Sequence, residues 1–244
     1  MSAPLLIVEQ EGAIKRLRFN RPEKRNALNL DLADLLLDAV TQAATDGTRL
    51  LVLRGNGAGF CAGFDFSQLD DASPGDLLLQ LVRIEQTLQA LAHAPFDTLA
   101  LVHGDAIGAG AEILVACRHR IGSANARTCF PGARFGLILG SRRLAQCVGP
   151  DAAQALIGSL QRQDAARLQQ LGLLNEVVEQ EAWADYEKTL LAQVTQVPAP
   201  TRTRVLAALR ADTRAQDMCD LAHSAAQPGL KQRIADYRAS LRGS

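Results

Sequence analysis

The sequence predicts an α/β fold that continues into a C-terminal helical region. Two observations support this class: strand-like and helix-like segments alternate between residues 5 and 104, and the pattern is mostly helical after about Asp151. A chain of 244 residues is also long enough to bury a sizeable apolar core. We therefore expect a largely parallel core sheet with crossover helices, followed by further helices.

The first elements follow from local patterns. Residues 5–20 predict two strands around Glu11-Gly12, because β-branched and apolar residues flank a turn pair. A strand is expected at 49–55, a helix at about 75–92 and another strand at 98–104. Between the first two strands and the third, residues 30–46 predict a helix with an apolar face made of Leu32, Leu35, Leu36, Ala39, Val40 and Ala43.

The second half of the chain is helical in pattern, with breaks at LLNEVV (173–178) and VPAP (197–200). Its tail, LKQRIADYRASLR, predicts a basic amphipathic helix. We divide the chain into a core, residues 1–196, and a C-terminal helical region, residues 197–244. That region carries apolar side chains that need a surface to cover: Val205, Leu206, Leu209, Leu221, Ile234 and Tyr237.

Charge and cysteine usage exclude several classes of function. Lys plus Arg and Asp plus Glu both total 26, so there is no global electrostatic attraction to nucleic acid or to an anionic membrane. The sequence has no segment near the roughly 20 apolar residues that span a bilayer. Five scattered cysteines predict neither a disulfide framework nor a zinc site. We expect reduced thiols and a cytoplasmic protein without nucleic-acid or membrane partners.

Two glycine-rich turns follow predicted strands, GFCAGFDF at 59–66 and GDAIGAGAE at 104–112. Small residues let the backbone approach a ligand, and the free amides at a helix start point outward, so two such turns can direct donors at one oxygen. This arrangement is an oxyanion hole in outline, in which one donor contributes about 2.7 to 4 kcal/mol. The alternative is that these glycines only make tight turns and close helix packing. Neither turn has the ending of a P-loop.

Four segments at compatible spacing resemble the crotonase family, also called the enoyl-CoA hydratase/isomerase family. They are FNRPEKRNALN (19–29), GFCAGFDF, LVHGDAIGAGAEILVACRHRIGSANAR (101–127) and LQQLGLLNEVV (168–178). The resemblance runs in order across nearly the whole chain. It implies a crotonase-like ββα spiral core and an acyl-CoA thioester as the substrate, with coenzyme A as part of that substrate and no other cofactor or metal.

The same resemblance assigns the oxyanion hole to two backbone N–H groups, those of Phe64 and Ala109. It also places coenzyme A along the first turn and beside the loop after RPEKR. The residues implied there are Ala62, Gly63 and Asp65, with Lys24 and Arg25 near the phosphates. For Lys24 and Arg25 the alternative is an ordinary solvated loop.

Glu112 occupies the position of the first of two catalytic glutamates of family hydratases. In an apolar pocket its pKa would rise, so that it could exchange protons near neutrality. The alternative is a helix N-terminal residue that is favoured by the helix dipole.

The second glutamate of family hydratases is expected in the segment ARTCFPGARFGL, where Gly132 stands instead. The segment that follows, ILGSRRL, is also shorter than the usual glycine-rich continuation. Gly132 can neither activate water nor donate a proton, so two-carboxylate hydration is in doubt.

Other polar residues near these motifs have simpler interpretations. We expect His103 to stabilise a turn, and Cys61 and Cys129 to be small pocket or core residues, because a nucleophilic thiol needs a lowered pKa and an activating partner.

These expectations lead to an enoyl-CoA hydratase/isomerase-type enzyme, a lyase or isomerase of fatty acid metabolism, that works through an enolate with one glutamate. Double-bond migration or enolate protonation suits a single carboxylate better than water addition. Decarboxylation, carbon–carbon cleavage and thioester hydrolysis are alternatives. So is a non-catalytic acyl-CoA-binding paralogue. Family members are commonly trimers or dimers of trimers, so a homo-oligomer of that kind is expected.

Overall fold

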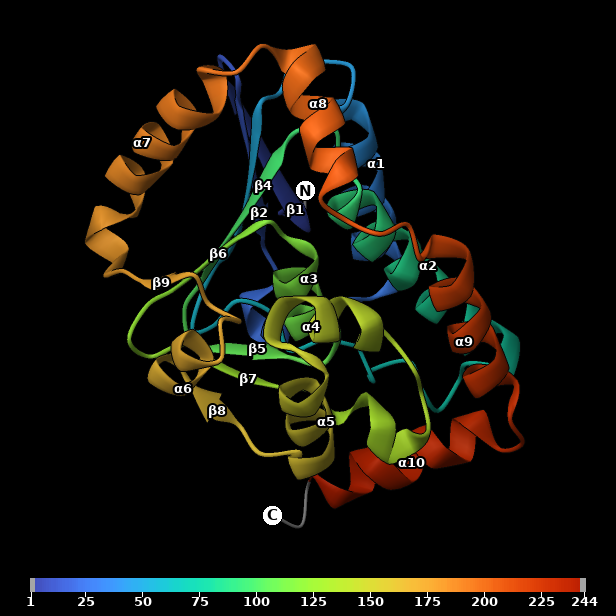
Figure 1. Ribbon diagram of the computed structural model, residues 1–244. Coiled ribbons are helices and arrows are strands. Elements are labelled where there is room, and N and C mark those ends of the chain that lie inside the picture. Colours follow the sequence, from blue (N-terminus) through green and yellow to red (C-terminus); the bar gives the residue numbers. More distant parts are fainter. Residues whose placement is uncertain (1–2, 242–244) are drawn as a thin grey trace.

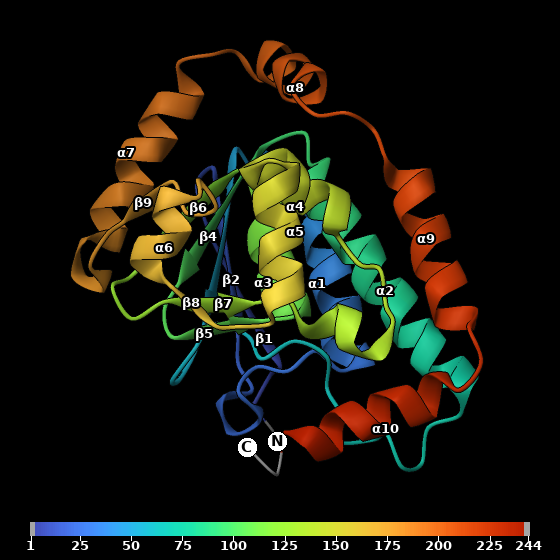
Figure 2. The same ribbon diagram turned by 60° about the horizontal axis from the view of Figure 1, so that its bottom comes forward.

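A computed structural model describes residues 3–241 of the chain (Figures 1 and 2). Residues 1–2, which begin the predicted core, and residues 242–244, which end the predicted C-terminal region and include the last residue of the predicted tail helix, lie outside the described residues. One sheet has the order β1-β2-β3-β4-β6-β9 and a second has the order β5-β7-β8. The strands are β1 Leu6–Glu11, β2 Ile14–Phe19, β3 Leu50–Gly55, β4 Asp97–Val102, β5 Asp105–Ile107, β6 His119–Gly122, β7 Arg127–Cys129, β8 Gln163–Asp164 and β9 Glu176–Val177.

The large sheet confirms the predicted topology. Strands β1 and β2 form the expected antiparallel hairpin, and β2, β3, β4, β6 and β9 are paired in parallel. Helices cross over between the parallel strands, as a sheet of this kind requires. The α/β class with a C-terminal helical region is therefore confirmed. The small sheet of β5, β7 and β8 was not predicted.

The helices are α1 Leu30–Ala43, α2 Pro74–Ala92, α3 Ala109–Ala116, α4 Ser141–Val148, α5 Pro150–Ser159, α6 Ala165–Gln170, α7 Trp183–Thr195, α8 Ala199–Ala208, α9 Arg214–Ala226 and α10 Leu230–Ser240. Short 3-10 helices are η1 Pro22–Lys24, η2 Pro131–Phe135 and η3 Gln180–Ala182. Helix α1 begins after Asn29, whose side chain accepts a hydrogen bond from the Leu32 N–H at 3.1 Å.

The predicted apolar face of α1 is right except for Leu35, which is 44% exposed. The face is centred on Leu36 and Ala39, and Leu35 lies at its edge, while Ala33 on the opposite edge is buried. A broad apolar stripe does not reveal which edge residue meets a neighbour, because that depends on where the next helix packs. Helix α2 provides that neighbour for α1.

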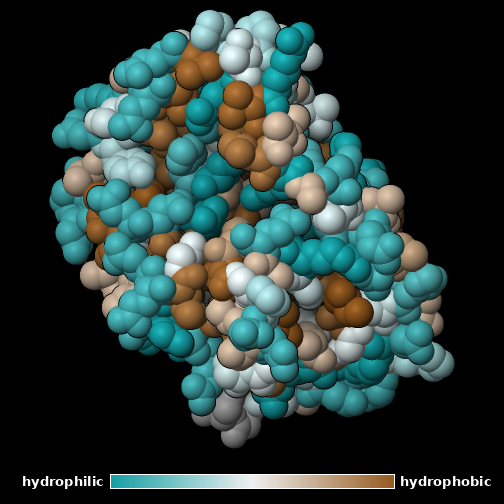
Figure 3. All heavy atoms as spheres, viewed as in Figure 1, coloured by the Kyte–Doolittle hydropathy of each residue, from teal (hydrophilic) through white to brown (hydrophobic). Residues whose placement is uncertain are grey.

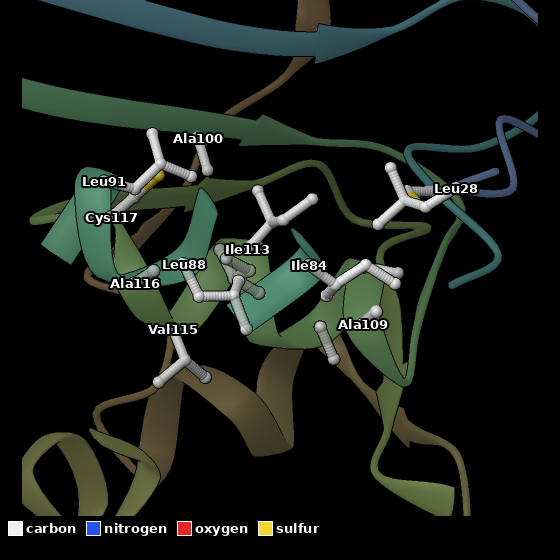
Figure 4. Close-up of a cluster of buried hydrophobic side chains, with 14 of the residues drawn as sticks. Leu28, Ile84, Leu88, Leu91, Ala100, Ala109, Ile113, Val115, Ala116 and Cys117 are labelled. Atoms are coloured by element: carbon white, nitrogen blue, oxygen red, sulfur yellow. The ribbon is translucent and has the colours of Figure 1, made fainter. Parts of the chain in front are cut away.

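Helix α3 lies at the centre of the molecule, and all eight of its residues are buried. Figure 4 shows Ile84, Leu88 and Leu91 of α2 beside the apolar side chains of α3, among them Ile113. Helix α2 is fixed at its start by a capping box between Ser73 and Asp76. Because apolar neighbours surround α3, the one charged side chain on this helix is held away from water.

The C-terminal helices run around the core instead of forming a body of their own (Figure 2). Helix α9 packs along α2, and α10 packs against η2. Leu221 and Ile234 are thereby buried within the chain, whereas Val205 is 41% and Leu209 77% exposed on or next to α8. Figure 3 shows apolar side chains on the facing sides of α7 and α8, around a hollow.

Candidate active site

The two glycine-rich turns are joined to each other by backbone hydrogen bonds. The Cys61 N–H donates to the Asp105 carbonyl at 3.1 Å, and the Ile107 N–H donates to the Cys61 carbonyl at 2.9 Å. Gly110 faces Cys61 so closely that a Cβ would collide with the Cys61 carbonyl, and a Cβ at Gly63 would collide with the Ile107 carbonyl. The glycines therefore allow the two turns to meet, which is more than a single tight turn requires.

The two residues that carry the predicted donor amides, Phe64 and Ala109, line the same cleft. Ala109 is the first residue of α3, where a helix leaves its N–H groups without an intrahelical acceptor. Within residues 3–241 neither the Phe64 nor the Ala109 N–H donates a hydrogen bond. Two unused donors from joined turns are what an oxyanion hole needs.

Asn26 fixes the loop that carries Lys24 and Arg25. It is fully buried, and its side-chain amide donates to the carbonyls of Asn56, Gly59 and Phe60 at 2.8, 3.0 and 3.1 Å. Its backbone has a φ of 57°, a left-handed conformation that Asn tolerates better than most residues. The sequence motif contains Asn26 but did not suggest a role for it. A buried Asn that bonds three carbonyls can be recognised only in the folded chain.

The cleft is large and mixed in character, with a volume of about 1030 Å³. Ala62 and Asp65 line one side of it, and Gly63 packs behind them against Ile107. The Asp65 carboxylate is bonded to Arg21 at 2.8 Å and to the Ser67 N–H at 2.9 Å. Burial alone would raise the pKa of Asp65, but the contacts with Ser67 and Arg21 outweigh this effect and lower the pKa.

Lys24 and Arg25 are exposed and line the mouth of the same cleft. The structure thus brings the two predicted cations and the two amide turns to one cavity. A long ligand with an anionic end and a carbonyl would meet positive charge at the mouth and backbone donors inside.

Helix α10 forms part of the rim. Tyr237 lies 5.0 Å from Phe135 and 6.0 Å from Phe66, measured between ring centroids. Lys231 donates to the carbonyls of Asp70 and Ala72, both at 2.8 Å. Arg233 donates to the Phe135 carbonyl at 2.8 Å and also to the carbonyls of Gly136, Ser224 and Gln227. The C-terminal helix is therefore bonded to the cleft it borders.

Glu112 lines the cleft from the first turn of α3 and is only 6% exposed. Its Oε2 has no hydrogen-bond partner among the described residues. Burial raises the pKa of Glu112 to about 8, with the nearby Arg143 guanidinium opposing this and the carboxylates of Glu85 and Asp217 adding to it. Around neutral pH both its acid and its base forms are accessible, as proton exchange requires.

Gly140 lies directly against the Glu112 carboxylate. A Cβ at this position would collide with Oε2, and the φ of 67° already favours glycine. Gly140 is also the residue that precedes α4. In the sequence, the segment that contains it, ILGSRRL, was distinguished only by its short length.

Gly132 lines the cleft in η2, and the nearest atom to a Cβ built on it is the Leu137 carbonyl oxygen at 3.8 Å. A longer side chain could therefore be added at position 132. The other carboxylates that line the cleft lie nearer its mouth or are paired: Asp70 with Arg238, Asp105 with Arg162 and Asp65 with Arg21, while Glu23 is exposed beside Lys24.

The remaining polar residues near the two turns are His103, Cys61 and Cys129. Nε2 of His103 lies 2.9 Å from the Gly57 carbonyl oxygen, a contact that stabilises the loop after β3. Burial raises the pKa of Cys61 to about 12 and also raises that of Cys129, so neither thiol is activated. Within residues 3–241 no group of three or more His, Cys, Asp or Glu side chains could hold a metal ion. None of the helices described combines the length and apolar character needed to cross a membrane.

A parallel core sheet, a second small sheet and two joined amide turns define a protein of the crotonase fold. A family model for enoyl-CoA hydratase/isomerase matches residues 9–228. The chain belongs to this family.

Relatives and solved structures agree with this membership. The chain is 32% identical over 183 residues to the probable enoyl-CoA hydratase echA6 of Mycobacterium bovis, covering 72% of this chain and 73% of that protein. It is 33% identical over 205 residues to the mitochondrial enoyl-CoA hydratase domain-containing protein 2 of Bos taurus. That match covers 79% of this chain and 68% of the Bos taurus protein. The chain also matches the crystal structure of an enoyl-CoA hydratase/isomerase homologue from Bordetella parapertussis, with 40% sequence identity and a TM-score of 0.95. That match covers 97% of this chain and 99% of the Bordetella chain.

Proposed function

We propose that this protein processes an acyl-CoA thioester through an enolate, with Glu112 as its acid-base group. The observation that supports this most is that one cleft contains two unused amide donors and a buried carboxyl group with a pKa of about 8. The thioester oxygen would accept hydrogen bonds from the Phe64 and Ala109 N–H groups. These donors stabilise the negative charge that develops on that oxygen when the α-carbon loses a proton.

Glu112 then exchanges the proton. As a carboxylate it takes a proton from one carbon of the acyl group, and as the acid it returns that proton to the same or a neighbouring carbon. One residue can carry out both steps, which favours double-bond migration or enolate protonation. Hydration needs water activated on a second group, and Gly132 supplies none.

Lys24 and Arg25 are proposed to bind the coenzyme A phosphates, with Ala62, Gly63 and Asp65 beside the rest of that group. Cations at a cleft mouth attract phosphates and form charge-assisted hydrogen bonds with them. We also propose a homo-oligomer, a trimer or a dimer of trimers, because Val205 and Leu209 leave apolar surface around α8 uncovered. A cytoplasmic location, inferred from the scattered thiols, stays a prediction.

The test of the proposed chemistry is Glu112→Gln, assayed on a panel of 2-enoyl-CoA and 3-enoyl-CoA substrates. The amide keeps the size of the side chain but cannot exchange a proton, so turnover should fall about 10²- to 10⁴-fold. Affinity for a saturated acyl-CoA, measured by calorimetry, should stay within a few-fold. Glu181→Gln, on an exposed side chain far along the sequence, is the matched control.

A second candidate is a non-catalytic acyl-CoA-binding protein, and Gly132 is the observation that favours it. Wild-type protein that binds acyl-CoA but turns over no member of the panel would support this candidate. Unchanged turnover in Glu112→Gln would contradict the role of Glu112 and leave the binding cleft in place.

A further inference from the structure

Helix α4 begins in the cleft, directly beside Glu112. Its first residue, Ser141, lines the cleft, and the residue before it, Gly140, lies against the Glu112 carboxylate. Oε1 of Glu112 lies 3.1 Å from the position that a Cβ of Gly140 would occupy, and Oε2 lies closer still. The start of α4 and the proposed acid-base group are therefore neighbours in one cleft.

The N-terminus of α4 has no cap. The residue before the helix is Gly140, which has no side-chain oxygen that could accept a hydrogen bond from the first N–H groups. Glu112 does not replace such a cap: it is only 6% exposed, yet its Oε2 has no hydrogen-bond partner among the described residues. The first N–H groups of a helix lack an intrahelical acceptor, and a ligand can supply one.

Ser141 adds a hydroxyl group that can bind a ligand. Its side chain is half-buried, and between residues 3 and 241 its hydroxyl group makes no hydrogen bond. A serine hydroxyl group can both donate and accept. The polar groups that α4 presents to the cleft are therefore not used by the protein itself.

The wall around this hydroxyl group is apolar. The other residues that line the cleft from segment 137–141 and from α2 are Leu137, Ile138, Leu139, Leu81 and Ile84. In small-molecule sites, a few polar groups in a mostly apolar wall determine orientation and specificity. Ser141 has this character in the part of the cleft next to Glu112.

The position of Ser141 indicates which part of the substrate it would meet. Ala109 and Glu112 are three residues apart on α3 and therefore lie on the same face of that helix. A thioester oxygen bound by the Ala109 N–H would direct the α-carbon toward Glu112. The next atoms of the acyl group would then lie beside Gly140 and Ser141.

The ligand atom that Ser141 binds should be an uncharged oxygen. A helix N-terminus and a hydroxyl group both favour a hydrogen-bond acceptor. In the proposed function Glu112 takes a proton as a carboxylate, and a second negative charge beside it would be repelled. A hydroxyl or a keto oxygen can accept the hydrogen bond without this repulsion.

We propose that Ser141 is a specificity-determining residue, whose hydroxyl group binds an uncharged oxygen, a hydroxyl or a keto group, on the acyl group of the substrate. This inference rests on the proposed function and names its substrate class: an acyl-CoA whose acyl group carries such an oxygen. Acyl groups of this class still have the α-proton that enolate formation needs.

Calorimetry with butanoyl-CoA, 3-hydroxybutanoyl-CoA and 3-oxobutanoyl-CoA tests the proposal. The wild-type protein should bind at least one of the two oxygenated thioesters about fivefold to tenfold more tightly than butanoyl-CoA, because one hydrogen bond is added. Ser141→Ala should remove this preference and leave the affinity for butanoyl-CoA within about twofold. Ser141→Thr keeps a hydroxyl group and should retain the preference. Alanine favours a helix, so the Ser141→Ala variant should fold.

Ser67→Ala is the matched control, because Ser67 lines the same cleft on the segment that follows the first amide turn. It should leave the ratio of the affinities unchanged. Equal wild-type affinity for the three thioesters, or a preference that survives in Ser141→Ala, would overturn the proposal. Tighter binding of succinyl-CoA, whose acyl group ends in a carboxylate, would also overturn it if Ser141→Ala abolished that binding. Failure of the proposed function would show differently, as unchanged turnover in Glu112→Gln while the preference that depends on Ser141 remains.

Discussion

Replacement of Glu112 by Gln should make the protein more stable, and by an amount that depends on pH. The pKa of Glu112 is about 8 in the folded protein, against an ordinary value of 4.5. Below pH 4.5 both the folded and the unfolded chain carry the proton, so titration of Glu112 costs no stability. As pH rises from 4.5 toward 8, the unfolded chain releases the proton while the folded chain keeps it, and the free energy of unfolding decreases.

The magnitude follows from the size of the shift. Each pH unit in this window changes the free energy of unfolding by about 1.4 kcal/mol. Between pH 4.5 and about pH 7 the accumulated loss is on the order of 3 kcal/mol. The amide of the Glu112→Gln variant does not titrate, so the variant should escape this loss. The difference between variant and wild type should level off above about pH 8.

Urea unfolding at a series of pH values between about 4 and 9, at one fixed protein concentration, measures this difference. Glu181→Gln, which also removes one carboxylate, should show no comparable gain. Wild-type and Glu112→Gln curves that run parallel across the whole range would refute the reasoning, because the Glu112 carboxyl group would then have the same pKa in the folded and unfolded chain.

Three further outcomes are expected. Wild-type protein should hydrate crotonyl-CoA with a kcat/KM below about 10⁴ M⁻¹s⁻¹. Gly132→Glu should raise this value, and Gly132→Gln should not. Efficient hydration by the wild-type protein would contradict our interpretation of Gly132. Joint replacement of Lys24 and Arg25 by Ala should weaken coenzyme A binding about tenfold, as measured by calorimetry. Unchanged affinity would show that these two residues lie on an ordinary solvated loop and do not bind coenzyme A. Light scattering at micromolar concentration should give the mass of a trimer or a hexamer for the wild-type protein. Leu209→Asp should give a lower mass. A wild-type mass that equals one chain would argue against assembly.

The helices and strands that could be predicted from the sequence are those in which apolar and polar residues alternate with the period of a helix or a strand, or which a turn motif delimits. The hairpin of β1 and β2, the parallel strands and α1 each follow from side-chain periodicity over six or more residues or from a turn signal. Strands β8 and β9 have two residues each, too few for any period to be detected. They exist because a neighbouring strand pairs with them, and only the folded chain provides that neighbour.

The candidate site divides in the same way. Glu112 and the two amide turns could be located because the glycine-rich segments that contain them resemble motifs of the enoyl-CoA hydratase/isomerase family, whereas the small residues alone were equally consistent with tight turns. Arg143 gave no comparable signal, since its partners Glu85 and Asp217 are 58 and 74 residues away. Gly140 was missed because its role is to leave room for a side chain that comes from another helix.

The way α10 is bonded to the cleft has a consequence for which substitutions the rim of this protein can accept. The hydrogen bonds that Lys231 and Arg233 donate end on main-chain carbonyls of the rim and of the preceding turn. Every residue type presents a carbonyl, so these hydrogen bonds do not depend on the side chain at Ala72, whereas Asp70 and Phe135 also contact α10 through Arg238 and Tyr237. A substitution at Ala72 can therefore change what the rim presents to a ligand while these anchors of α10 are kept.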